Sequence, residues 1–247
     1  MKKYIFGNFK MNMTIKDTEK YIEKFLPLVE NSKNEIVIFP SYVNLMFAKQ
    51  KLTASKVLLG AQNVSGETAG AYTGEVSSSM LKSVGVNYVI IGHSERRKLF
   101  LEKNEQINKK ILEALKEGLN VVLCIGESKY ERTNKKYKPA LEKEIQEALK
   151  GLYENELKNI VIAYEPVWAI GTGKHPAVKE IEEAVAIIRN EIKQEYSETS
   201  AKNIRVLYGG SVNSQNAKMF ANIAGVNGLL VGGASLNAED FAKIASI

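Results

Sequence analysis

The sequence is poor in the residues that build disulfides and metal centres. Among its 247 residues it has one cysteine, Cys124, and two histidines, His93 and His175. A single cysteine excludes an intrachain disulfide, and two histidines are too few for a zinc-type ligand cluster. We therefore expect a protein with no bound metal and no other cofactor, working in a reducing cytoplasm.

The sequence also lacks a long hydrophobic run, and none of its apolar stretches approaches the length of a membrane span. Lys2 and Lys3 precede a short apolar stretch at residues 4–6. Gly7 and Asn8 interrupt that stretch far too early for an export signal. We expect neither export nor membrane association.

A charge excess is present but modest, at a formal net charge of +6. Lysine-containing segments such as residues 103–116 and 136–150 mix lysine with glutamate at helical spacing, which favours a solvated surface over a nucleic-acid site. We expect no nucleic-acid partner. A mild positive field would still steer a small anionic substrate toward a cleft.

Short apolar runs rich in valine and isoleucine alternate with longer segments that carry a helical period. This pattern is typical of a parallel sheet that is buried on both faces. The expected strands are Tyr4–Asn8, Ile36–Phe39, Leu58–Ala61, Tyr88–Ile91, Asn120–Ile125, Ile160–Tyr164, Arg205–Tyr208 and Gly228–Val231.

The segments between these strands predict helices with one apolar stripe each. Examples of the stripe are Ile181, Val185, Ile188 and Ile192, and likewise Leu141, Ile145, Leu149 and Leu152. The first helix is expected to begin after Thr14, with Asp17 as the acidic residue of a capping box, and to end within residues 27–30.

Eight strand–helix pairs in one chain of this length predict an α/β fold, a closed (β/α)8 barrel of eight parallel strands ringed by helices. With no linker and no shift in composition, we expect residues 1–247 to form a single catalytic domain. A doubly wound open sheet is the alternative, but no G-x-G-x-x-G sequence follows the first strand.

Polar residues follow several of the expected strands, at the end of a barrel where working residues gather. Lys10, His93 and Glu165 follow the first, fourth and sixth strands, so a closed barrel can direct all three into one cavity. A carboxylate can remove a proton beside a carbonyl, an imidazole can polarise the oxygen, and an ammonium can stabilise the enediolate. Each residue alone is a weak signal, but the set favours catalysis.

Glycine pairs follow the last two strands, at Gly209-Gly210-Ser211 and Gly232-Gly233, each expected just before a helix. Open backbone amides at a helix N-terminus suit a phosphate, and the loops after strands seven and eight are the usual phosphate site of such barrels. We therefore expect Ser211, Gly232 and Gly233 to bind a substrate phosphate. The alternative is that these glycines only make tight turns.

An apolar loop with glycines near its end follows Glu165 and predicts a lid over the ligand. Its residues are Pro166, Val167, Trp168, Ala169, Ile170, Gly171, Thr172, Gly173 and Lys174. Closure would expel water and bring the Gly171 amide to the phosphate, while Pro166 stiffens one end.

The quoted residues carry a family resemblance that covers the whole chain. Its most specific segments are GNFKMN at residues 7–12, YVIIGHSERR at 88–97, AYEPVWAIGTG at 163–173, YGGSV at 208–212 and VGGASL at 231–236. The chain resembles the triosephosphate isomerase family. The resemblance implies a TIM barrel that interconverts dihydroxyacetone phosphate and D-glyceraldehyde 3-phosphate, a reaction of glycolysis and gluconeogenesis, without a cofactor.

The resemblance also implies roles for individual residues. Glu165 would be the base, His93 a neutral electrophile, Lys10 the electrostatic partner, and Asn8 an aid at the oxyanion. As in the family's known example of pKa tuning, the helix that opens at Ser94 and Glu95 would lower the pKa of His93.

The family is typically dimeric, and the resemblance implies that the loop at residues 62–77 reaches a partner subunit with its tip at Thr73. A loop of this length without regular structure is otherwise hard to explain. The alternative is a disordered loop, which is less favoured because Ala69, Ala71 and Tyr72 are available to bury.

Two other functions compete with this interpretation. A sugar-phosphate epimerase on a similar barrel would typically need a metal site or paired acids, and two histidines do not readily build the former. A non-catalytic protein that binds phosphorylated metabolites would keep the glycine pairs but would have no need of Lys10, His93 and Glu165 together.

Overall fold

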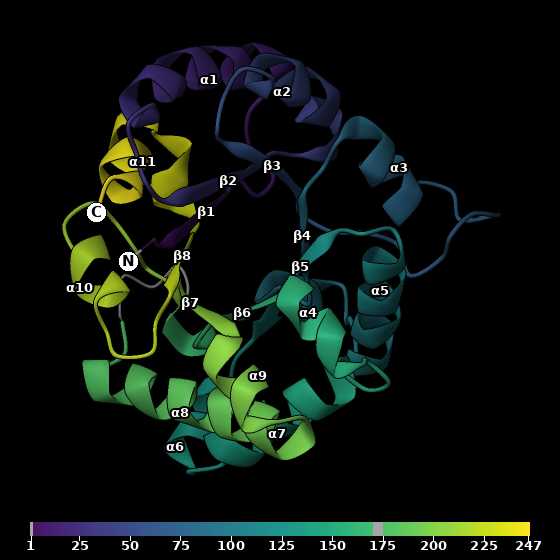
Figure 1. The fold of residues 1–247 in the computed structure, drawn as a ribbon, viewed down its shortest axis with the longest axis vertical. Coiled ribbons are helices and arrows are strands. Elements are labelled where there is room, and N and C mark those ends of the chain that lie inside the picture. The colour runs from purple at the N-terminus through teal and green to yellow at the C-terminus, as the bar shows by residue number, and fades with distance from the viewer. Residues whose placement is uncertain (1, 170–174) are drawn as a thin grey trace.

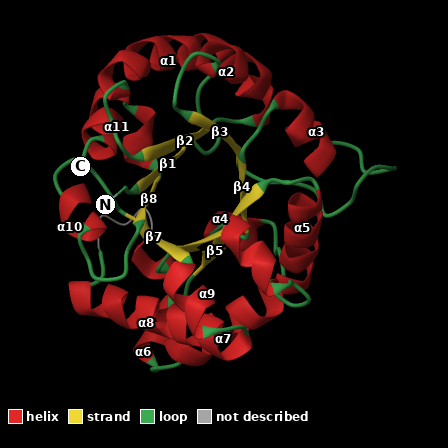
Figure 2. Cartoon of the chain, viewed as in Figure 1, coloured by secondary structure: helices red, strands yellow, loops and turns green. Residues whose placement is uncertain are grey.

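The strands of the protein form a ring that closes on itself. The computed structural model describes residues 2–169 and 175–247. Within those residues, eight parallel strands pair in sequence order, and β8 pairs with β1 to complete a closed barrel. Figures 1 and 2 show the strands at the centre with the helices around them. The expected closed (β/α)8 barrel is confirmed.

Most of the expected strands are confirmed to the residue. The strands are β1 (Tyr4–Asn8), β2 (Glu35–Phe39), β3 (Leu58–Ala61), β4 (Tyr88–Ile91), β5 (Asn120–Ile125), β6 (Ile160–Tyr164), β7 (Arg205–Gly210) and β8 (Gly228–Val231). β2 begins one residue earlier than expected, because Glu35 pairs with Tyr4 of β1. β7 runs two residues further, because Gly209 and Gly210 pair with β8 despite the low strand preference of glycine.

The helices between and after the strands surround the barrel. They are α1 (Ile15–Val29), η1 (Tyr42–Asn44), α2 (Leu45–Leu52), α3 (Ser78–Val84), α4 (Ser94–Leu99), α5 (Asn104–Lys116), α6 (Lys129–Thr133), α7 (Tyr137–Ala148), η2 (Glu154–Asn159), η3 (Val167–Ala169), α8 (Val178–Glu195), α9 (Glu198–Asn203), α10 (Ala217–Ala221), η4 (Gly233–Leu236) and α11 (Ala238–Ala245). The capping box of Thr14 and Asp17 at the start of α1 is confirmed.

One helix is shorter than its apolar stripe predicts. α7 ends at Ala148, so Leu149 caps it and Leu152 lies beyond it, although both side chains are buried. The Leu152 amide donates to the Leu149 carbonyl, and Gly151 turns the chain with a φ of 79°. The apolar period therefore continues through a turn that is not helical, and burial alone does not mark the end of this helix.

The barrel interior is filled by side chains, and a second apolar layer joins the strands to the helices. The interior cluster consists of Phe6, Val37, Phe39, Tyr88, Ile90, Val122, Cys124, Val161, Ala163, Leu207 and Leu230. The Phe6 ring lies 5.0 Å from the Tyr88 ring and 5.7 Å from the Phe39 ring, measured between centroids. A packed interior leaves ligand binding to the rims of the barrel, where the loops begin.

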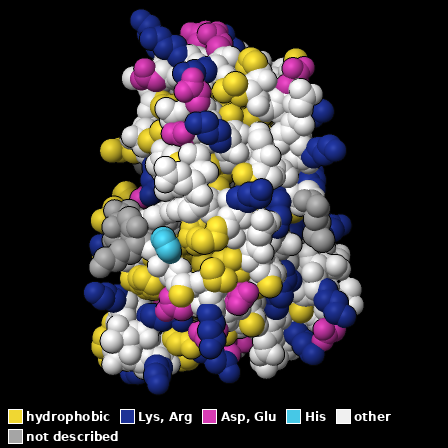
Figure 3. All heavy atoms as spheres, turned by 90° about the vertical axis from the view of Figure 1, so that its left-hand side faces the viewer, with side chains coloured by type: hydrophobic (Ala, Val, Ile, Leu, Met, Phe, Trp, Pro, Cys, Tyr) yellow, Lys and Arg dark blue, Asp and Glu magenta, His cyan; other side chains and the backbone are white. Residues whose placement is uncertain are grey.

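Charged side chains of both signs cover the surface. On the face in Figure 3, lysine and arginine are interspersed with aspartate and glutamate. Within the two segments that mix lysine with glutamate, Lys116 pairs with Glu113 and Lys138 pairs with Glu142. This arrangement agrees with the expected solvated surface. In the described part of the chain, no helix is both long enough and apolar enough to cross a membrane.

Candidate active site

The carboxyl ends of three strands bring an acid, a base and a cation together. Lys10 follows β1, His93 follows β4 and Glu165 follows β6. The three side chains line one pocket of about 280 Å³, together with Asn8, Gly210, Leu230 and Gly232. The expectation that these distant residues meet at one end of the barrel agrees with this geometry.

His93 and Glu165 are in direct contact. The Nε2 atom of His93 lies 3.2 Å from Oε1 of Glu165, and both side chains are buried. The other oxygen of Glu165 accepts a hydrogen bond from the Ser94 amide at 3.3 Å. His93 is the N-cap of α4, and its Nδ1 accepts from the Glu95 amide at 3.2 Å. Because an amide can only donate, Nδ1 carries no proton, and the ring N–H is at Nε2, facing Glu165.

The close contact shifts the pKa of both partners. Burial lowers the pKa of His93, but the charge and hydrogen bond of Glu165 raise it more, to above its ordinary value. Burial raises the pKa of Glu165, but His93, the Ser94 amide and Lys10 lower it more, to below its ordinary value. The expected depression of the His93 pKa is therefore wrong for this arrangement, because the carboxylate outweighs the N-terminus of α4. The low pKa of Glu165 leaves it ionised, as a base must be.

Lys10 adopts an unusual backbone conformation that its neighbours stabilise. Its φ is 52°, in the left-handed region that non-glycine residues seldom occupy. The Lys10 amide donates to Oδ1 of Asn8 at 2.9 Å, and Nε2 of Gln62 donates to the Lys10 carbonyl at 2.8 Å. Its Nζ donates to Oε1 of Glu95 at 2.5 Å. Strain held by surrounding contacts is common at functional sites.

Gln62 has a supporting role that the sequence did not reveal. Besides the Lys10 carbonyl, its Nε2 also donates to the Phe39 carbonyl at 2.8 Å. The side chain thus joins the ends of β1 and β2 from the end of β3. Its position directly after a strand was the only signal in the sequence, and it gave no indication of the partners.

The glycines that were expected to follow the seventh strand lie within it instead. No helix begins directly after Gly209-Gly210 in the described chain, since these residues end β7 and α10 begins at Ala217. A Cβ at Gly209 would lie 2.9 Å from Cγ of Glu165, and one at Gly210 would lie 2.4 Å from the Tyr208 hydroxyl oxygen. The missing side chain at Gly209 therefore makes room for the carboxylate beside it.

The glycines after β8 agree better with expectation. Gly232 is the N-cap of η4, and it lines the pocket beside Lys10. A Cβ at Gly233 would meet no atom within 4 Å, so the backbone there is open to approach. The Ser211 hydroxyl donates to the Ala169 carbonyl at 2.9 Å. Gly171, the fourth expected phosphate-binding residue, lies outside the described residues.

The first part of the expected lid is attached to a buried carboxylate. The Val167 amide donates to the Glu127 carbonyl at 3.1 Å, and Nε1 of Trp168 donates to Oε1 of Glu127 at 3.0 Å. Arg132 pairs with the same oxygen of Glu127 at 3.1 Å. Glu127 is the second residue after β5, but its sequence position gave no sign of these contacts. Of the other expected lid residues, Pro166 and Ala169 are described, and Ile170, Thr172, Gly173 and Lys174 lie outside the described residues.

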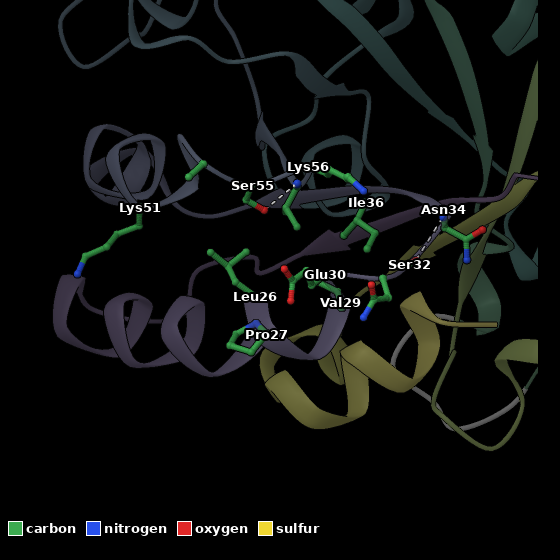
Figure 4. A pocket seen from close by; sticks show the side chains of 13 residues that line it. Leu26, Pro27, Val29, Glu30, Ser32, Asn34, Ile36, Lys51, Ser55 and Lys56 are labelled. Atoms are coloured by element: carbon green, nitrogen blue, oxygen red, sulfur yellow. Dashed lines mark hydrogen bonds between the residues drawn. The ribbon is translucent and has the colours of Figure 1, made fainter.

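A larger pocket lies on a different part of the molecule, with an empty volume of about 1130 Å³. Figure 4 shows its side chains, which come from the end of α1, the segment that leads into β2, the start of β2, the end of α2 and the segment between α2 and β3. Lys51 there pairs with Glu19 and Glu23. No histidine belongs to the described lining of this pocket. No histidine and carboxylate converge in its described lining, so the smaller pocket is the stronger candidate active site.

No metal cluster accompanies the site in the part of the chain that the structure describes, where no three histidine, cysteine, aspartate or glutamate side chains are grouped to bind an ion. The arrangement can instead transfer protons directly. A buried carboxylate, an imidazole N–H and an ammonium at the carboxyl end of a closed barrel define an acid–base enzyme of the (β/α)8 class.

Comparison with known proteins identifies the family within that class. The family model for triosephosphate isomerase matches residues 3–247. The triosephosphate isomerase of Aquifex aeolicus is 49% identical over 245 residues, covering 99% of this chain and 98% of the relative. That of Caldanaerobacter subterraneus is 46% identical over 242 residues, covering 98% of each. The chain belongs to the triosephosphate isomerase family.

Proposed function

We propose that Glu165 and His93 carry out the interconversion of dihydroxyacetone phosphate and D-glyceraldehyde 3-phosphate in this chain, the reaction of its family in glycolysis. The observation that supports these roles is the buried contact between the Glu165 carboxylate and the Nε2–H of His93. The carboxylate is ionised, and the ring N–H faces the place that a substrate oxygen would take.

The proposed reaction moves one proton between neighbouring carbons. Glu165 removes a proton from the carbon beside the carbonyl, and the electron pair moves onto the carbonyl oxygen to form an enediolate. His93 donates its Nε2 proton to that oxygen and receives one from the neighbouring hydroxyl, and Glu165 returns its proton to the other carbon. Substrate bound between the two side chains would separate the Glu165 carboxylate from Nε2 of His93. The main cause that raises the pKa of His93 would then be lost.

Lys10 and Asn8 are proposed to stabilise the negative charge of the enediolate. Lys10 lines the pocket beside the acid–base pair, and an ammonium there favours the negatively charged enediolate oxygen over the uncharged carbonyl of the substrate. The Glu95 carboxylate pairs with Nζ of Lys10 and holds it at the pocket, although Glu95 does not line the pocket. Ser94 and Glu95 support the pair through the amides that contact Glu165 and His93.

The substrate phosphate is proposed to bind at the amides of Ser211, Gly232, Gly233 and Gly171. The open backbone at Gly233 and the start of η4 support this assignment for the loop after β8. The segment from Pro166 to Lys174 is proposed to close over the phosphate as a lid. Release of Ser211 from the Ala169 carbonyl would then accompany closure.

A homodimer is proposed for this chain. Large hydrophobic side chains are exposed in the loops and helices that follow β1, β2, β3 and β4, at one side of the barrel: Met11, Tyr42, Val43, Met46, Tyr72, Met80, Phe100 and Leu101. Met11 is 95% exposed, and Ala69, Ala71 and Tyr72 of the loop near Thr73 are exposed as well. A second copy of the chain would bury these side chains. Figure 1 shows this loop projecting from the barrel between β3 and α3.

Sedimentation velocity tests the dimer. The protein is expected to sediment as a dimer at micromolar concentration, and Thr73→Arg at the loop tip is expected to shift it to monomer. A wild-type protein that remains monomeric would contradict the proposal.

We further propose that residues 1–247 act as one catalytic domain in the cytoplasm.

The activity itself is tested by incubating pure protein with dihydroxyacetone phosphate and following glyceraldehyde 3-phosphate, without added metal or nucleotide. Conversion is expected, and a chelator is expected to leave the rate unchanged. A reaction that requires an added metal would favour a sugar-phosphate epimerase, and binding without conversion would favour a non-catalytic binding protein.

A further inference from the structure

Glu144 on α7 contacts the backbone behind the candidate active site without lining the pocket. Its Oε2 accepts a hydrogen bond from the Gly126 amide at 2.9 Å, and its Oε1 lies 3.5 Å from Nη1 of Arg97. The side chain is 19% exposed, so it is largely enclosed between α7 and the barrel. One carboxylate thus joins two segments that follow different strands.

The first of these segments borders the proposed base. A Cβ at Gly126 would lie 1.8 Å from the Glu165 carbonyl oxygen, so the Gly126 backbone packs directly on that of Glu165. The residue before it, Ile125, accepts a hydrogen bond from the Glu165 amide at 2.7 Å. A displacement of Gly126 is therefore transmitted to the backbone that carries the Glu165 side chain.

The second segment borders the proposed acid. Nε of Arg97 donates to the carbonyl of Gly92 at 2.7 Å, and Gly92 immediately precedes His93. Nη2 of the same guanidinium donates to the Cys124 carbonyl at 3.1 Å, near the end of β5. Arg97 thus ties the end of β4 to the end of β5, and Glu144 pairs with the guanidinium that does so.

We propose that Glu144 is a positioning residue that fixes the separation of Glu165 and His93 through Gly126 and Arg97. The inference rests on the proposed function, because it assigns to Glu144 the geometry of that acid–base pair. Glu144 does not touch the pocket, so it acts only through the two backbone segments. An error of about 1 Å in such a pair can lower a rate by roughly a hundredfold.

The proposal separates the chemical step from substrate binding. The proposed phosphate amides follow β7 and β8, whereas the contacts of Glu144 lie at the ends of β4 and β5. Loss of Glu144 should therefore lower kcat and leave KM unchanged. If Glu144 only stabilised the fold, its loss would lower the free energy of unfolding without lowering kcat selectively over KM.

The experiment compares three substitutions of Glu144 with the substitution Glu142→Leu, which changes a neighbouring glutamate on α7 that pairs with Lys138 instead. Glu144→Leu removes the acceptor and is expected to lower kcat about tenfold, with KM within twofold of the wild type. Glu144→Gln retains an oxygen for the Gly126 amide and is expected to keep kcat within about threefold. Glu142→Leu is expected to leave both constants unchanged.

Glu144→Asp provides the test if Glu144→Leu does not fold. It keeps the charge but is one methylene shorter, so the proposal expects a lower kcat than for Glu144→Gln. A kcat of Glu144→Asp that equals or exceeds the kcat of Glu144→Gln would overturn the proposal. A kcat within twofold of the wild type in Glu144→Leu would also overturn it. A rise in KM that matches the fall in kcat would also overturn it.

The variant Glu165→Asp is assayed in the same series. If it leaves turnover unchanged, the proposed function fails, whatever the Glu144 variants do. If it lowers turnover while Glu144→Leu does not, only the positioning role of Glu144 fails.

Discussion

The two ends of the barrel carry pockets of very different size and chemistry. The pocket at the carboxyl ends of the strands is about 280 Å³, and the pocket beside the amino end of β2 is about 1130 Å³. The smaller one is lined by Lys10, His93 and Glu165 from three strand ends. The larger one is lined by residues of consecutive segments, and its Lys51 is already paired with two glutamates. Convergence of side chains, and not volume, marks the site.

The difference arises from how the backbone leaves each strand. At the carboxyl ends, polar residues begin the loops, and local features direct them inward: the left-handed backbone of Lys10, the N-cap position of His93 and the missing Cβ of Gly209. At the other end, α1 and α2 finish near the pocket, and the charged side chains there, Glu30, Lys51 and Lys56, come without a histidine in the described lining. Substitutions at the two ends should therefore differ in their effect on the reaction.

The largest effect is expected from Lys10→Met. This change keeps much of the side-chain length but removes the charge proposed to stabilise the enediolate, so kcat/KM should fall by roughly a thousandfold. Steady-state kinetics measure the fall, and circular dichroism checks that the fold persists. A loss smaller than tenfold in a folded variant would mean that the ammonium is not needed.

A smaller effect is expected from Glu165→Asp. The shorter side chain withdraws the carboxylate by about 1 Å, and turnover should fall by roughly a hundredfold. The Ser94 amide and His93 remain as partners, so the fold should be preserved. Turnover at the wild-type level would remove Glu165 from the mechanism.

A change in stability, and not in rate, is expected from Glu144→Gln as the pH is varied. Burial raises the pKa of Glu144 from 4.5 to about 7, although Arg97 and the Gly126 amide lower it, while Glu131 and Glu127 raise it further. The unfolded chain therefore releases this proton near pH 4.5, and the native chain keeps it until about pH 7. The wild type loses stability across that window, whereas glutamine does not titrate.

Urea unfolding at pH 5 and pH 8 measures this difference. The stability of Glu144→Gln relative to the wild type is expected to increase between the two pH values by about 2 to 3 kcal/mol. Glu142→Gln on the same helix gives the baseline. A relative stability that is the same at both pH values would show that Glu144 ionises normally in the native protein.

The fold could be predicted from the sequence because each buried strand is a short run of apolar residues between polar ends. β4 and β5 are such runs, and their bounds are confirmed. The extension of β7 could not be predicted, because Gly209 and Gly210 are strand residues only through their pairing with β8. The end of α7 could not be predicted either, since the apolar period continues past Ala148.

Much of the candidate site could be predicted from topology, because strand ends meet at one rim of a closed barrel. The pKa of His93 could not be predicted, because it depends on the Glu165 carboxylate, which lies 3.2 Å away but is distant in sequence. The contacts of Gln62, Glu127 and Glu144 are likewise tertiary, and nothing in their local sequence specifies the partners. The alternation of strands and helices in the sequence places these side chains at strand ends. Their contact partners depend on how the chain folds in three dimensions.

The smallest effect is expected from Lys56→Met, the same substitution as Lys10→Met made at the larger pocket. β2 separates the two ends of the barrel by roughly 13 Å, and charges this far apart are largely screened at physiological ionic strength, where the Debye length is about 8 Å. Both kcat and KM should stay within twofold of the wild type in physiological salt. If Lys56→Met lowered kcat as Lys10→Met does, the larger pocket would contribute to the reaction, and the contrast between the two ends would fail.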